Sequence, residues 1–111
     1  MSAPAGARIV PASRELAAAL HILAAPCIRD RACRFVGDSG EVDWLRLEQA
    51  AGLWSWGEWL LVAAAQDLCN GHAPAGLKRL CATLDSADLQ RVLEAVCILR
   101  PDVAPPGGWS R

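Results

Sequence analysis

Apolar side chains recur every three or four residues through most of the chain, which is the spacing that places them on one face of an α-helix. In the first such segment Ser13 can cap a helix and Pro26 can end it. The apolar positions at this spacing are Leu16, Leu20 and Leu23. The pattern therefore predicts a helix between Ser13 and Pro26.

The segment 27–43 fits two different structures. Residues 27–36 place apolar side chains on one side and charged side chains on the others, as a short helix would. The turn sequence 37–40, between residues 34–36 and 41–43, equally favours a small hairpin. The sequence leaves the choice between helix and hairpin open.

The longest predicted helix runs from Trp56 to the Asn-Gly pair at 70–71. Ser55 and Glu58 form a capping-box pattern at its start, and the glycine is placed to end it. Projection at about 100° per residue places on the core face Gly57, Leu60, Leu61, Ala64 and Leu68. Trp59 falls among the polar positions opposite this face, and Trp56 lies at their edge. Two large aromatic side chains are therefore expected to point outwards.

Three further helices are predicted from the same kind of pattern. One covers 41–51, and a short one covers 77–84. The last is capped by Asp85 or Ser86 and ends at Pro101. Its apolar positions, which we expect in the core, are Leu89, Val92, Leu93, Val96 and Leu99.

These elements predict an all-α fold, a small irregular bundle of five or six short helices. With 111 residues, 53% of them hydrophobic, the chain can close one core without metal or disulfide support. We expect a single helical domain over 13–100. The segments 1–12 and 101–111 contain proline and glycine with little periodicity, and they are predicted to be flexible tails.

Composition indicates a cytoplasmic protein. The five cysteines form no C-x-x-C motif and cannot all pair within one chain, as expected in a reducing compartment. The apolar run 16–25 is far shorter than the roughly 20 residues that span a bilayer, so no membrane partner is expected. Abundant alanine and the single lysine, Lys78, suggest a GC-rich bacterial genome.

The C-terminal half of the chain resembles a group of small proteins. The segment 55–71, followed by Leu84-Asp85-Ser86 and by 92–95, resembles small uncharacterised helical proteins of high-GC bacteria. Their shared pattern is a serine-x-glycine-glutamate start, a leucine-rich helix ending in glycine, and a leucine-aspartate cap. The resemblance implies a helical fold and no particular activity.

No catalytic set stands out in the sequence. Cys69 and His72, with Cys81 farther on, are the closest approach to a metal site, but their spacing is unspecific and leaves metal binding open. His21 lies beside no nucleophile motif. We therefore expect a non-enzymatic protein without a cofactor.

DNA binding is the alternative function. The segment 47–55 resembles the helix, glycine turn and second-helix start of a helix-turn-helix. The second helix would, however, present Glu58 and two tryptophans to the phosphates, and the net charge of the chain is −1. Only the cluster Arg29, Arg31 and Arg34 supplies local positive charge.

Tryptophan is the remaining signal, because five tryptophans in this chain is a high number and the residue is enriched at protein interfaces. Trp44 and Trp54 are expected to pack inside. The predicted function is protein–protein interaction or self-association, and a homo-oligomer is the simplest form because a two-fold interface needs one patch. The predicted partner-binding residues are Trp56, Trp59, Val62 and Gln66.

Overall fold

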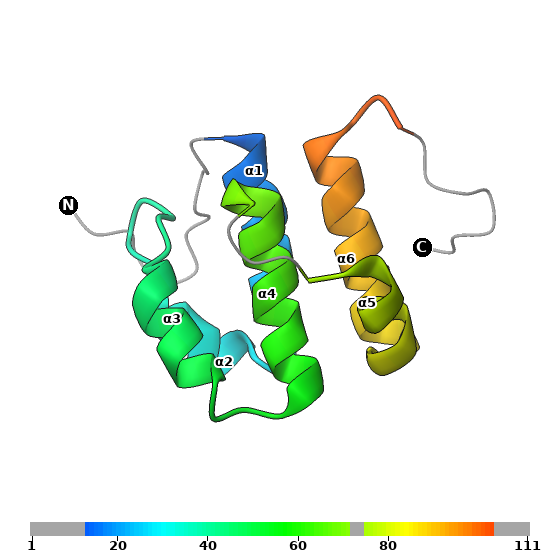
Figure 1. The fold of residues 1–111 in the computed structure, drawn as a ribbon. Helices are drawn as coiled ribbons and strands as arrows, with labels where there is room; N and C mark the ends of the chain where they lie inside the picture. Colours follow the sequence, from blue (N-terminus) through cyan, green and yellow to red (C-terminus); the bar gives the residue numbers. More distant parts are fainter. Residues whose placement is uncertain (1–12, 72–74, 104–111) are drawn as a thin grey trace.

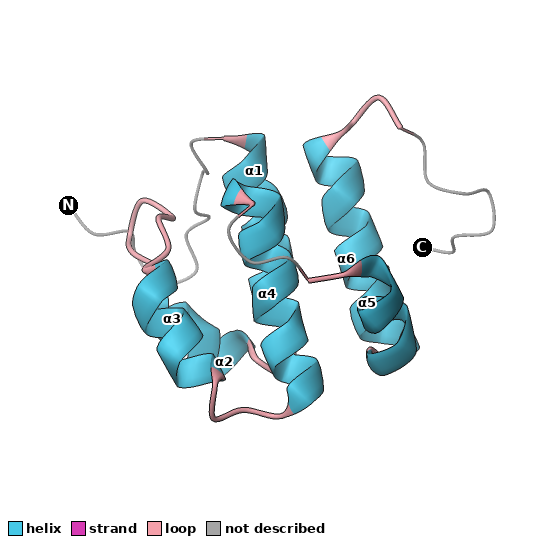
Figure 2. Ribbon diagram, viewed as in Figure 1, coloured by secondary structure: helices cyan, strands magenta, loops and turns pink. Residues whose placement is uncertain are grey.

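The structure is a computed structural model that describes residues 13–71 and 75–103. The described residues form six α-helices and one short 3-10 helix, so the all-α prediction is confirmed (Figures 1 and 2). In chain order the elements are α1 (Arg14–Leu23), α2 (Arg29–Ala32), η1 (Cys33–Phe35), α3 (Trp44–Ala51), α4 (Trp56–Asn70), α5 (Leu77–Thr83) and α6 (Ser86–Leu99). The predicted N-terminal tail 1–12 and residues 104–111 of the predicted C-terminal tail lie outside the described residues.

Hydrogen bonds to side chains set the starts of the helices. The Ser13 hydroxyl accepts from the Leu16 amide at 3.1 Å, and the Asp85 carboxylate accepts from the Asp88 amide at 2.8 Å. α3 begins later than predicted, because Asp43 is its cap and the first helical residue is Trp44. The predicted caps of α1 and α6 are confirmed.

The capping box of α4 is present in full. The Glu58 amide donates to the Ser55 hydroxyl at 3.3 Å, and the Ser55 amide donates to the Glu58 carboxylate at 3.1 Å. Gly71 ends the helix with a φ of +73°, a left-handed conformation that glycine adopts without steric cost. Both predicted boundaries of the longest helix are therefore confirmed.

α4 is the central helix of the bundle. It packs against α1, α3, α5 and α6, and α1 also packs against α6 (Figure 1). As a result every residue from Leu60 to Gln66 is buried, not only those on the predicted core face. Trp44 and Trp54 pack against this core, as expected.

The segment 27–43 combines the two structures that its sequence allowed. α2 and η1 form its helical part, and Val36 and Val42 then pair in a single antiparallel bridge. The Gly37 amide donates to the Glu41 carbonyl at 2.8 Å, which closes the turn between them. Each interpretation therefore describes one part of the segment.

The buried face of α6 differs from the predicted one. Val92 and Ala95 are buried, whereas the Leu93 and Val96 side chains are 42% and 39% exposed, so the expectation that these two residues fill the core is wrong. Leu93 lies one residue, about 100°, around the helix from Val92. α1 and α4 pack against α6 mainly on the side of Val92.

None of the helices in the described part of the chain combines the length and the apolarity needed to cross a membrane.

Candidate interaction surface at the start of α4

Trp56 and Trp59 lie one turn apart at the start of α4 and stack on each other. Their ring centroids are 5.2 Å apart and their planes differ by 5°. Trp59 is half-buried and packs on the core, while Trp56 is 52% exposed. Trp56 therefore points outwards as expected, whereas Trp59 is only partly exposed and stacks against the Trp56 ring.

α5 supplies a cationic side chain to the same place. The Arg79 guanidinium carbon lies 5.8 Å from the centroid of the Trp56 ring, within the range of a cation–π contact. Lys78 precedes it, and both side chains are exposed. The five residues Trp56, Trp59, Leu77, Lys78 and Arg79 are called the Trp56 surface below.

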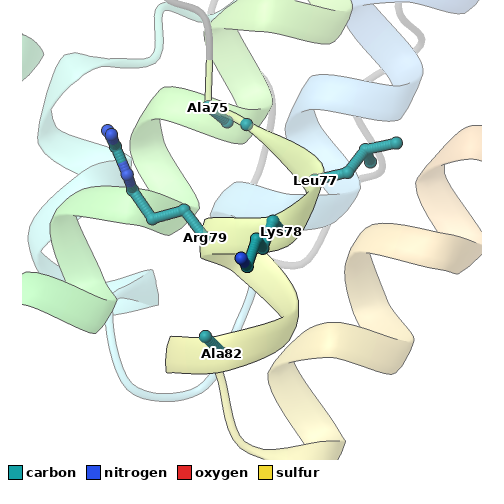
Figure 3. A pocket seen from close by; sticks show the side chains of 6 residues that line it. Ala75, Leu77, Lys78, Arg79 and Ala82 are labelled. Carbon is teal, nitrogen blue, oxygen red and sulfur yellow. The ribbon is translucent and has the colours of Figure 1, made fainter.

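A hollow of about 750 Å³ adjoins this surface along α5. Figure 3 shows Arg79 extending to one side of α5, Leu77 to the other, and Lys78 between them. Leu77 is 80% exposed. The complete lining is Ala75, Gly76, Leu77, Lys78, Arg79 and Ala82. The hollow is thus lined by apolar and basic side chains, with no acidic side chain among them.

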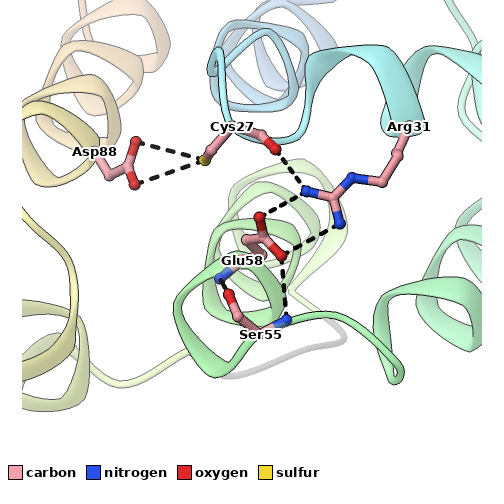
Figure 4. Close-up of polar contacts among 5 residues, drawn as sticks. All are labelled: Cys27, Arg31, Ser55, Glu58 and Asp88. Carbon is pink, nitrogen blue, oxygen red and sulfur yellow. Dashed lines mark hydrogen bonds and ion pairs between the residues drawn. The ribbon is translucent and has the colours of Figure 1, made fainter.

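Arg31 binds the first turn of α4 through Glu58, and this pair of residues is called the arginine clamp below (Figure 4). Arg31 donates to both carboxylate oxygens of Glu58, at 2.6 and 3.3 Å, and to the Cys27 carbonyl at 2.6 Å. Its guanidinium carbon also lies 4.6 Å from the centroid of the Trp54 ring. The hydrogen bond from Arg31 lowers the pKa of Glu58 below its ordinary value, so Glu58 stays ionised.

The Cys27 thiol lies beside the Asp88 carboxylate, with the sulfur 3.7 and 3.9 Å from the two oxygens. Burial, followed by the nearby charge of Asp88, raises the pKa of Cys27. Burial, followed by the charge of Asp85, likewise raises the pKa of Asp88. The raised pKa of Cys27 favours a protonated thiol, which is the opposite of what activates a nucleophilic cysteine.

Two of the four predicted partner-binding residues do not reach the surface. Val62 is 2% exposed and Gln66 is 8% exposed, so the expectation that they form part of a docking surface is wrong. They follow Trp59 by three and seven residues, on the same side of an α-helix, but this spacing could not show that four neighbouring helices pack against α4. The structure supplies Arg79 and Leu77 instead, and no local pattern connected these α5 residues to Trp56.

The arginines of the DNA-binding alternative do not form a free cluster. Arg31 is bound to Glu58, and Arg29 lies 3.8 Å from Asp30. Arg34 is exposed on η1. The burial of residues 60–66 in the middle of α4 also prevents this helix from entering a DNA groove as a recognition helix would. Both observations weigh against this alternative.

The metal-site candidates are not assembled in the described structure. Cys69 is half-buried and Cys81 is exposed, and His72 lies outside the described residues. Within the described ranges, no group of three or more histidine, cysteine, aspartate or glutamate side chains is arranged to hold a metal ion. All five cysteines are free thiols.

No protein-family model matches this chain, and neither a curated protein nor a solved structure matches it.

Proposed function

We propose that this protein is a non-enzymatic helical module that binds another protein chain through the Trp56 surface. The observation that carries the proposal is the position of Trp56, which is 52% exposed yet stacked on Trp59 and contacted by Arg79. A large apolar ring that is held in place before binding loses little conformational entropy when a partner covers it. Tryptophan and arginine are also the residue types that most often dominate interface energies.

The titratable groups near this surface support a binding role rather than catalysis. Glu58 is engaged by Arg31 and by the amide of Ser55. The raised pKa of Cys27 keeps its thiol protonated at neutral pH. An engaged carboxylate and a protonated thiol are poorly suited to acid–base or nucleophilic catalysis.

Self-association is the form of binding to test first, since it needs no second protein. If the chain self-associates through this surface, Trp56→Ala shifts the sedimentation-equilibrium mass towards the monomer without lowering the unfolding midpoint. Leu45→Ala is the matched control, because Leu45 is also an exposed apolar residue but lies on α3. Wild-type protein that stays monomeric at every concentration would exclude self-association and leave a different protein as the partner.

A further inference from the structure

Lys78 and Arg79 form an adjacent pair of cations without carboxylate partners. Among the residues that the structure describes, no aspartate or glutamate lies within ion-pair distance of either side chain. Arg31 and Arg100, by contrast, hold carboxylates at 2.6 and 2.7 Å. The segment 75–84 also contains no acidic residue. The two positive charges are therefore available to an external group.

Apolar side chains lie directly beside this basic pair. Leu77 is highly exposed at the start of α5, and the Trp56 ring lies under the Arg79 guanidinium. Leu77, Lys78 and Arg79 line the hollow along α5 (Figure 3), and the Trp56 ring lies beside it, in contact with Arg79. An occupant must consequently offer negative charge and a bulky apolar group close together.

A second copy of the chain does not match this pattern in a two-fold contact. Such a contact places the same patch of both copies face to face. Lys78 and Arg79 of one copy would then approach those of the other, and like charges brought together at an interface are unfavourable. The charge of the surface thus favours a different protein as the partner.

We propose that the Trp56 surface and its hollow bind a segment of another protein that carries carboxylates next to an aromatic or aliphatic side chain. The carboxylates pair with Lys78 and Arg79, and the apolar side chain packs on the Trp56 ring beside Arg79. This inference rests on the proposed function and specifies its partner. Nucleic acid fits less well, because two unpaired cations on a chain of net charge −1 give little phosphate affinity.

The test uses a random-peptide display library as the probe and the full chain as the target. Selection on wild-type protein at low salt is expected to enrich peptides with aspartate or glutamate beside an apolar residue. Fluorescence anisotropy then measures the affinity of these peptides. We expect the double charge reversal to weaken binding about tenfold or more. High salt should weaken it as well.

The controls separate the charge effect from loss of folding. Arg29→Glu/Arg34→Glu makes the same change in net charge on α2 and η1, and it should leave peptide binding nearly unchanged. Lys78→Gln/Arg79→Gln removes the charges without reversing them, and it should give an intermediate affinity. Circular dichroism melting checks that each variant keeps its fold.

The results distinguish this inference from the proposed function. If peptides lose affinity for Trp56→Ala but bind Lys78→Glu/Arg79→Glu as well as wild type, the Trp56 surface is a docking site and the acidic partner is wrong. If neither change matters, or no peptide is enriched, both proposals fail. Dimerisation that depends on Trp56, or binding of a random DNA duplex through Lys78 and Arg79, would also overturn the acidic-segment proposal.

Discussion

Arg31 and Glu58, which are 27 residues apart, join α2 to the start of α4 through an ion pair of 2.6 Å. Glu58 also completes the capping box of α4, so one carboxylate serves a local and a long-range contact. The residues next to it in α4 are Gly57 and Trp59. The clamp thereby fixes the first turn of α4, from which Trp56 is presented.

Loss of this clamp should destabilise the protein. We expect Arg31→Ala to lower the urea midpoint of unfolding, because the Glu58 carboxylate would lose both hydrogen bonds from the Arg31 guanidinium. Arg31→Lys should recover only part of the loss, since a lysine cannot donate two hydrogen bonds in the fork geometry of a guanidinium. Arg29→Ala is the control, because the ion pair of the Arg29 side chain is with the exposed Asp30 at 3.8 Å. Equal midpoints for the Arg31→Ala and Arg29→Ala variants would show that the clamp does not stabilise the fold.

A contact between α1 and α6 should make stability depend on pH. His21 Nε2 lies 2.8 Å from the Glu94 carboxylate, and this hydrogen bond lowers the pKa of Glu94. A carboxyl whose pKa is lower in the folded state contributes stability above its unfolded pKa, about 4.3, and loses it as the pH falls through the folded value.

Glu94→Gln should therefore lower the free energy of unfolding at neutral pH, and its difference from wild type should shrink as the pH falls below about 4. Urea titrations of both proteins at several pH values measure this difference. The contribution is modest because the Glu94 side chain is partly exposed. A difference that stays constant down to acidic pH would contradict the assignment.

Core and surface leucines should differ sharply in their contribution to stability. Leu61 is fully buried in α4, so Leu61→Ala should cost about 2–5 kcal/mol by leaving a cavity. Leu93→Ala should cost less than about 1 kcal/mol, because a large part of this side chain already contacts solvent. Chemical denaturation of the two variants gives both values. Comparable losses would mean that α6 is rotated relative to the arrangement described.

The sequence by itself determined the all-α fold and the ends of α1, α4 and α6 that local caps set. The caps at Ser13, Ser55 and Asp85 are hydrogen bonds between residues three apart, and the stop at Gly71 depends on the conformation of one residue. Such contacts involve only neighbouring residues, so the order of residue types predicts them. Trp56 lies at the edge of the polar face of its helix, so its outward position could also be predicted from the order of residues.

Only the tertiary structure decided which helix faces are covered and which distant side chains meet. Val62 and Gln66 are buried because four other helices pack against α4, whereas Leu93 is exposed because no helix covers its side of α6 to the same extent. The contact of Arg79 with Trp56 depends on how α5 packs beside α4. A hydrophobic pattern gives the direction of a side chain around its own helix, but burial and long-range contacts depend on the positions of the neighbouring helices.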